Sequence, residues 1–230
     1  MNFLALAQKL VEKCGISGTG PVSVVGQSGE LKRAVNWINE AWMSIQQTRE
    51  DWDWMRGSVS FSTIAQQGSY TPAQCGVSDL AEWFTNSQYC SFRGYDTNVG
   101  VNSEIFLSHI DYNTYRDIYL YGSMRQSYAR PLSIAIAPDM SICLGQIPDS
   151  GNYTIVGDYF KTPTEMVNDT DIPGLPTRFH MLIVYQAMIY YGEYEQDEYV
   201  RQTAENNYRK MLGNMTVAQL PEMLNGCALA

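Results

Sequence analysis

The clearest pattern of apolar and polar positions in the chain runs through residues 175–212. Between residues 179 and 191, apolar and aromatic side chains cover almost the whole circumference of a helix, which indicates that protein encloses this helix on several sides. After Gly192 the apolar positions narrow to one stripe at helical spacing, and Gly213 is expected to end the helix. We therefore predict one central helix over residues 177–212.

Acidic side chains gather at the start of the amphipathic half of this helix. They are Glu193, Glu195, Asp197 and Glu198. Asp197 stands four residues before Arg201, so the two are expected to form an ion pair on the helix surface. The simplest interpretation of the four acids is a solvated face that complements the helix dipole, and the alternative is a set of general acids and bases.

Two further amphipathic helices are expected near the start of the chain. Residues 2–14 place their apolar side chains on one face, and Gly15 ends this pattern. A longer helix is predicted over residues 29–55, after Ser28 as the N-terminal cap. Its apolar face is broad, which indicates contact with more than one neighbouring element.

The pattern changes to short strands and turns after residue 56. Val59 and Phe61 alternate with serines at the period of two that a half-buried strand requires. Further strands are predicted over residues 83–93, 132–137, 141–144 and 153–160, and a helical spacing interrupts them over residues 103–121.

Together these patterns predict an α+β fold: an α-helical bundle body formed by both chain ends, with a β-rich insertion, plus an extended C-terminal arm. The expected boundaries are residues 1–56 and 164–212 for the helical body, 57–163 for the α+β insertion and 213–230 for the arm. The arm is too apolar for a free disordered end. It either docks on another protein or packs back on its own domain.

Composition adds an indication of assembly. Charged residues make up only 17% of the chain, whereas Tyr (16), Met (11) and Trp (5) are plentiful. Because such residues are favoured at interfaces, we expect other chains to cover much of the surface. The alternative is a monomer whose surface carries uncharged polar side chains.

The net charge of −9 argues against a surface that grips nucleic acid, since that affinity comes largely from Lys and Arg. A pore that lets DNA slide through is better lined with acids.

The five cysteines are scattered and are expected to be reduced thiols. No apolar run reaches membrane-spanning length, and the first residues lack the features of a signal peptide.

Candidate chemistry is sparse. His180 lies within the packed central helix and His109 has no nucleophilic serine motif to serve. The pairs Asp51/Asp53 and Asp169/Asp171 could hold a divalent cation, but such pairs are common by chance. Cys and His show no metal-ligand spacing. We therefore expect no enzyme, no metal and no cofactor.

Two rival functions stay open at this point. One is a small-ligand or carbohydrate-binding module, in which an exposed Trp52 or Trp83 stacks on a sugar. The other, weaker rival is an enzyme that acts through a metal held by Asp51 and Asp53.

Four segments carry a family resemblance. Residues 29–46 read Gly-Glu-Leu-x-x-x-Val-x-Trp-Ile-x-x-Ala-Trp-x-x-Ile-Gln, and residues 51–55 read Asp-Trp-x-Trp-Met. Residues 157–163 read Gly-Asp-Tyr-Phe-x-x-Pro, and residues 175–192 read Leu-Pro-x-x-Phe-His-x-x-Ile-Val-Tyr-x-Ala-Met-x-x-Tyr-Gly. With these motifs the chain resembles the head-to-tail adaptor family of tailed phages, also known as portal-associated connectors or tail tubular proteins.

The resemblance implies a virion structural protein at the head–tail junction, assembled in the host cytoplasm. It implies a homo-oligomeric ring, commonly twelvefold, between the portal protein and a tail tube or nozzle protein, with genomic DNA passing through unbound. The C-terminal arm would dock on the portal through Leu220, Met223 and Leu224. The four acids listed above would face the DNA channel or a neighbouring subunit.

Overall fold

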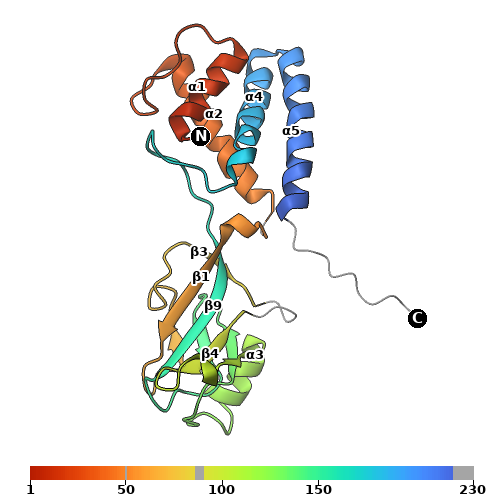
Figure 1. Ribbon diagram of the computed structural model, residues 1–230. Helices are drawn as coiled ribbons and strands as arrows, with labels where there is room; N and C mark the ends of the chain where they lie inside the picture. The colour runs from red at the N-terminus through yellow and green to blue at the C-terminus, as the bar shows by residue number, and fades with distance from the viewer. Residues whose placement is uncertain (50, 86–90, 220–230) are drawn as a thin grey trace, which may run out of the picture. The chain divides into compact units, whose positions relative to one another are not determined.

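The computed structural model describes residues 1–49, 51–85 and 91–219. The chain divides into two compact units (Figure 1). The first, which we call the terminal unit, comprises Met1–Met55 and Pro163–Ala230, and the second, the middle unit, comprises Arg56–Thr162.

Four α-helices form the regular part of the terminal unit. They are α1 (Phe3–Cys14), α2 (Gly29–Gln47), α4 (Met181–Glu195) and α5 (Glu198–Gln219). Asn2 caps α1 by accepting a hydrogen bond from the Ala5 N–H, and Gly15 ends it in the left-handed conformation at φ 66°, which confirms the predicted end. The all-round apolar α4 packs against α1, α2 and α5, so it is the central helix of this core.

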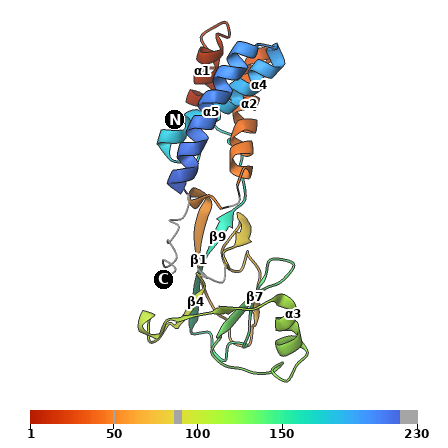
Figure 2. The ribbon, with the colours of Figure 1, turned by 90° about the vertical axis from the view of Figure 1, so that its right-hand side faces the viewer.

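The predicted single helix over residues 177–212 is wrong, because the chain reverses after Glu195. Gln196 takes the left-handed conformation at φ 57°, and the Asp197 N–H bonds back to the Gly192 carbonyl over 2.9 Å. This closes α4, and α5 returns alongside it (Figures 1 and 2). A Cβ atom on Gly192 would stand 2.9 Å from the Cβ of Arg201, so glycine is what lets the two helices approach.

The loops of the terminal unit are held by side-chain hydrogen bonds. The Asp169 carboxylate accepts from the Val24 N–H over 2.6 Å and from the Ser23 hydroxyl over 3.1 Å. Gln46 is buried and both donates to and accepts from the backbone of Thr164. These bonds satisfy polar groups that irregular backbone would otherwise leave unpaired.

Two sheets build the middle unit. The first contains β1 (Arg56–Ser62), β3 (Leu80–Trp83), β4 (Arg93–Asp96), β5 (Ile105–Phe106) and β9 (Tyr153–Lys161). Its order is β1-β9-β4-β5, and β3 also pairs with β9. The second contains β2 (Ser69–Tyr70), β6 (Ser108–His109), β7 (Ser133–Ile136) and β8 (Ile142–Leu144), in the order β2-β8-β7-β6.

The chain crosses from the first sheet to the second at Leu107, which is 1% exposed and lies between β5 and β6. The strands predicted over residues 132–137 and 141–144 are confirmed as β7 and β8, which pair antiparallel as a hairpin. The helical stretch predicted over residues 103–121 is shorter: α3 (Tyr112–Tyr115) continues as a π-helix over Arg116–Leu120. Tyr115 is buried in a cluster with Ala135 of β7, beside which α3 lies (Figure 2).

The α+β class fits, but the predicted bundle body with an extended arm is wrong. Within the described residues the protein is a mixed α+β structure with five α-helices and two sheets, and helices occur in both units. The helix predicted over residues 29–55 ends at Gln47, and β1 begins at Arg56 because β9 pairs with it from there. Residues 213–219 continue α5, since Met215 is fully buried in the core of the terminal unit.

None of the helices in residues 1–49, 51–85 and 91–219 is both long and apolar enough to cross a membrane.

Candidate assembly surfaces

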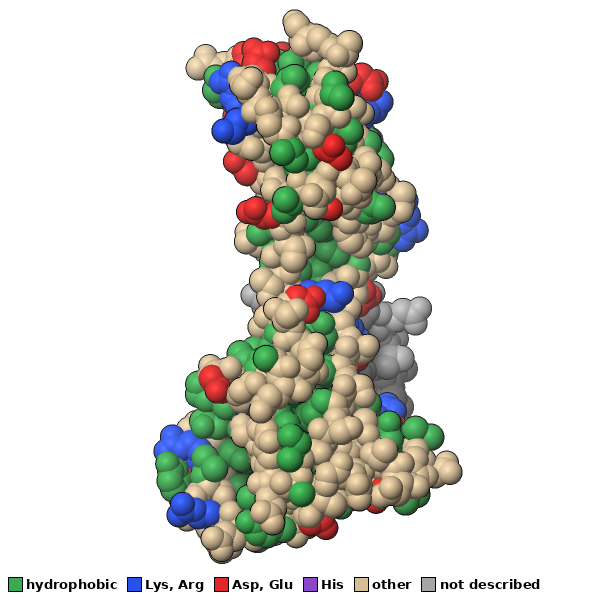
Figure 3. All heavy atoms as spheres, turned by 90° about the vertical axis from the view of Figure 1, so that its left-hand side faces the viewer, with side chains coloured by type: hydrophobic (Ala, Val, Ile, Leu, Met, Phe, Trp, Pro, Cys, Tyr) green, Lys and Arg blue, Asp and Glu red, His purple; other side chains and the backbone are tan. Residues whose placement is uncertain are grey.

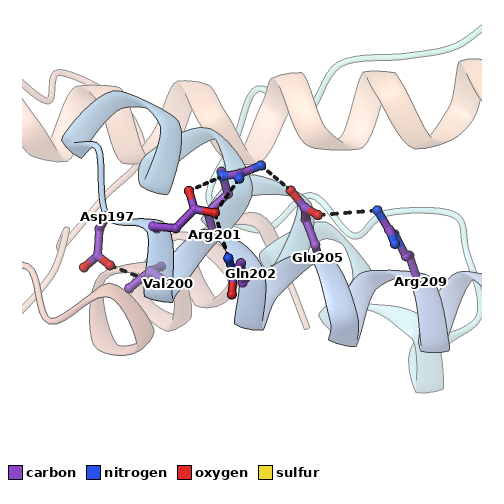
Figure 4. A network of polar contacts seen from close by, with 7 residues as sticks. Asp197, Val200, Arg201, Gln202, Glu205 and Arg209 are labelled. Carbon is purple, nitrogen blue, oxygen red and sulfur yellow. Dashed lines mark hydrogen bonds and ion pairs between the residues drawn. The ribbon is translucent and has the colours of Figure 1, made fainter.

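The acidic turn between α4 and α5 is the best-defined polar cluster predicted from the sequence. Asp197 caps α5: its carboxylate accepts from the Val200 N–H over 3.0 Å (Figure 4). Glu198 receives hydrogen bonds from Arg201 over 2.6 and 3.0 Å and from Gln202 over 2.8 Å. The guanidinium of Arg201 and the amide of Gln202 lower the pKa of Glu198, so this carboxylate stays ionised.

The predicted ion pair between Asp197 and Arg201 is wrong. Because α5 begins at Glu198, Asp197 lies before the helix and acts as its cap. Arg201 instead bridges Glu198 and Glu205, at 2.6 and 2.7 Å (Figure 4). Sequence reasoning missed this central role of Arg201, although the spacing of three residues from Glu198 was available as a signal.

The other two acids of the turn, Glu193 and Glu195, are exposed at the end of α4. In the part of the chain that the structure describes, neither side chain forms an ion pair. Glu195 lines a cleft of about 160 Å³ together with Glu30, Trp37 and Tyr191. Asp197 and Glu198 therefore stabilise the start of α5, whereas Glu193 and Glu195 expose their carboxylates to solvent.

The outer face of α5 is the longest exposed helix face of the terminal unit. Its side chains are Tyr199, Gln202, Thr203, Asn206, Arg209, Lys210, Asn214 and Val217. Tyr199 is 80% exposed and Val217 is 78% exposed, at opposite ends of the face. Arg209 and Lys210 are the charged residues of this face, and its other members are uncharged polar, aromatic or aliphatic side chains. Another protein can cover such a face where it supplies hydrogen-bond partners for the polar groups.

Exposed apolar residues also gather on the middle unit. Val99, Val101 and Phe106 are 61–69% exposed, and the Arg93 guanidinium stacks on the Phe106 ring at 4.5 Å from its centroid. Figure 3 shows one face on which hydrophobic side chains lie among uncharged polar groups and charged side chains are sparse. The low charge expected from composition is thus visible at the surface itself.

The tryptophans proposed for sugar stacking are not available for it. Trp52 is 1% exposed and donates its indole N–H to the Ile45 carbonyl over 3.1 Å. Trp83 is 2% exposed and donates to the Met140 carbonyl over 2.7 Å. Both rings are core residues, so a carbohydrate-binding module built on them is contradicted.

Asp51, Asp169 and Asp171 of the paired aspartates are engaged in structural bonds. Asp51 forms a bidentate ion pair with Arg49 at 2.8 and 2.9 Å, and Asp171 accepts from the N–H groups of Val167 and Asn168. Asp169 holds the loop at Val24, as described above. Among the described residues no group of three or more His, Cys, Asp or Glu side chains is placed to hold a metal ion.

The thiols of the half-buried Cys14 and the buried Cys75 have raised pKa values. Burial raises the pKa of Cys14 and of Cys75 to about 12, so both stay protonated at neutral pH. Such thiols are poor nucleophiles. They fit the expectation of reduced structural cysteines.

The residues proposed for the docking arm, Leu220, Met223 and Leu224, lie outside the described residues. α5 is described as far as Gln219, the residue directly before them in the sequence.

The chain was also compared with known proteins. Residues 1–225 match the family model described as SU10 adaptor protein, so the match includes both units. Among curated proteins no sequence matches this chain.

Proposed function

The chain belongs to the SU10 adaptor protein family, and we propose that it is a virion structural protein that joins the portal to the tail of a phage. The family match confirms the resemblance to phage head-to-tail adaptors. A family described as an adaptor indicates a structural role in the virion, at the head–tail junction, and not catalysis.

We propose further that the protein acts as a closed ring of twelve copies. The observation that carries this proposal is the outer face of α5, which is exposed, carries Arg209 and Lys210 as its charged residues and is bordered by Tyr199 and Val217. In a ring each subunit presents one surface to the next, so a free helix face has a natural partner in the neighbouring copy. Residues 1–56 and 164–212 would build the ring, and residues 57–163 would face the tail tube or nozzle protein.

The ring would surround the DNA during ejection. The protein carries a net charge of −9, and Glu193 and Glu195 lie exposed without an ion pair among the described residues. Negative charge at the channel wall would repel phosphate and let DNA slide without specific binding. We propose that these two acids line the channel, while Asp197 and Glu198 maintain the helix start behind them.

The portal would be held by the C-terminal residues beyond α5. Residues 220–230 contain Leu220, Met223 and Leu224, whose apolar side chains could enter a pocket on the portal. These residues follow the described part of α5 directly in the sequence. No cofactor or metal is required for any of these steps.

Light scattering coupled to size-exclusion chromatography tests the proposal. The protein alone and mixed with the portal of the same virion would be measured, and the mixture imaged by electron microscopy. A ring of adaptor subunits on the portal is expected, whether or not the free protein is monomeric. A protein that never joins the portal ring would overturn the proposal.

A further inference from the structure

The strand β1 leaves one edge of its sheet open. The sheet order is β1-β9-β4-β5, so β1 is the terminal strand and β9 is its only strand partner among the described residues. β1 spans Arg56–Ser62 and pairs with β9 along its whole length without a break in register. An edge strand of this length presents a row of unpaired backbone groups.

The hydrogen-bond pattern identifies which residues face outward. The Thr63 N–H donates to the Tyr153 carbonyl over 2.8 Å, so the odd-numbered residues of β1 direct their backbone groups toward β9. The N–H and C=O groups of Ser58, Ser60 and Ser62 therefore point to the open edge. The side chains of these three serines are exposed as well.

Most of this edge lacks the usual protection against pairing. Natural edge strands carry a lysine, a proline, a bulge or an inward charge that prevents another strand from adding. The charged residue of β1 is its first, Arg56, which forms an ion pair with Asp158 of β9, whereas residues 57–64, Gly-Ser-Val-Ser-Phe-Ser-Thr-Ile, contain no charge and no proline. The edge is thus chemically ready to accept a strand.

We propose that the strand it accepts is β1 of a second copy of this chain, antiparallel about a two-fold axis at Ser60. In that register Ser60 faces Ser60 of the second copy, and Ser58 faces its Ser62, so each outward N–H meets a carbonyl. On the buried face Val59 lies opposite Phe61 of the second copy, a β-branched and aromatic pair that stabilises sheets.

The self-complementary sequence is what selects a second copy as the occupant. Serine alternates with Val59 and Phe61 along β1. When β1 pairs with β1 of a second copy, each serine therefore lies opposite a serine and each apolar residue lies opposite an apolar residue, and no like charges are brought together. A one-residue slip would put Val59 and Phe61 on the opposite face, so the register is well specified.

This contact goes beyond the proposed ring. Neighbours in a closed ring are related by one repeated rotation, whereas the β1 contact relates two copies by a two-fold axis. The contact therefore belongs to the free protein or joins two rings, and either proposal can fail while the other stands.

Sedimentation and cysteine cross-linking test the contact. In an H-bonded antiparallel pair the Cα atoms lie about 5.5 Å apart and the two side chains stand on the same face, so Ser60→Cys is expected to give a covalent dimer with a short bifunctional thiol cross-linker. Ser108→Cys is the control, because Ser108 is exposed on β6 while its N–H is bonded to the Leu132 carbonyl. The parent chain gives the background from the native cysteines.

The Ser60→Lys variant provides a second test, because the two introduced lysines would lie opposite each other at the two-fold axis and repel each other. We expect a concentration-dependent dimer for the parent and for Ser108→Lys, and a monomer with unchanged circular dichroism for Ser60→Lys. A parent that stays monomeric and a Ser60→Cys variant that forms no cross-link would overturn the proposal. A dimer that Ser60→Lys leaves intact, or a β1 edge protected from hydrogen exchange only by a tail or portal protein, would also overturn it. If Ser60→Lys misfolds, the presence or absence of the Ser60→Cys cross-link decides whether the β1 contact forms.

Discussion

The imidazole Nε2 of His180 donates a hydrogen bond to the carbonyl oxygen of Leu175 over 3.1 Å. Because a carbonyl can only accept, Nε2 carries a proton. Nδ1 lies 2.6 Å from the amino group of Met1, which can donate to it only when Nδ1 is bare. The ring is 2% exposed, and the bond from Met1 requires the imidazole to be neutral.

The neutral state of His180 makes stability depend on pH. Burial, and then the positive charge of the Met1 amino group, lower the pKa of His180 below 6.5. The unfolded chain therefore takes up this proton first, and the free energy of unfolding is expected to fall as the pH decreases from 6.5 through the folded pKa. Urea unfolding across that window should show the loss, and His180→Gln should flatten it.

His109 provides the control for this experiment, because it is exposed on β6. His109→Gln should keep the pH dependence of the parent protein. An unchanged slope in His180→Gln would show that other groups control stability in this range.

The hairpin of α4 and α5 depends on Gly192. A Cβ atom there would lie 2.9–3.1 Å from the Cβ, N and Cα of Arg201. The N and Cα are backbone atoms of α5, so they cannot move aside without shifting the helix. We expect Gly192→Ala to lower the free energy of unfolding by about 1–3 kcal/mol, as overpacking does. Gly213→Ala is the matched control: nothing lies within 4 Å of its Cβ inside α5, so it should stabilise by about 0.5–1 kcal/mol. Equal effects of the two variants in urea unfolding would contradict this account.

These two glycines also show how far the sequence predicts the fold. Apolar periodicity located α1, the core face of α2, β9 and the hairpin of β7 and β8, since burial repeats along each element. It could not tell Gly192 from Gly213, because a helix-ending glycine and a close-packing glycine look the same without the neighbouring helix. Gly213 stays helical because Met215 beyond it is buried in the core.

The candidate surfaces were predictable to a similar degree. The four acids were identified from their clustering, but their roles depend on where α5 begins, and Arg201 was overlooked for that reason. The open edge of β1 could not be predicted, because sheet order is set by contacts distant in sequence, such as that of β1 with β9.

Trp52 separates a core role from a ligand-binding role. Its ring is buried and stacks with Trp54 at a centroid distance of 6.3 Å. Trp52→Ala is expected to cost about 3–5 kcal/mol of stability, as large aromatic deletions in cores do. Tyr199→Ala, at an aromatic side chain that is 80% exposed, should change stability by at most about 0.5 kcal/mol. Saccharide binding by the parent that disappears in Trp52→Ala without loss of stability would favour the rival function.

Burial within α5 determines where the chain can be truncated. Removal of residues 220–230 leaves the described part of α5, including the buried Met215, and should keep the thermal midpoint of the parent while it abolishes attachment to the portal. Removal of residues 214–230 also deletes the fully buried Met215, so it should lower the midpoint as well. Calorimetry and a pull-down with purified portal measure the two effects separately. Full portal binding by the shorter deletion would reject the docking role of Leu220, Met223 and Leu224.

The exposed acids of the turn test the channel itself. If Glu193 and Glu195 line the DNA path, Glu193→Lys with Glu195→Lys should still assemble on the portal, but the ring should retain DNA in a salt-dependent manner. Glu82→Lys is the control, because Glu82 is an exposed acid on β3 of the middle unit and should add no such retention. Electron microscopy reports assembly, and a filter-binding assay with double-stranded DNA at two salt concentrations reports retention. Loss of the ring without DNA retention would place the two acids against a neighbouring subunit instead, because reversed charge would then break the contact between copies.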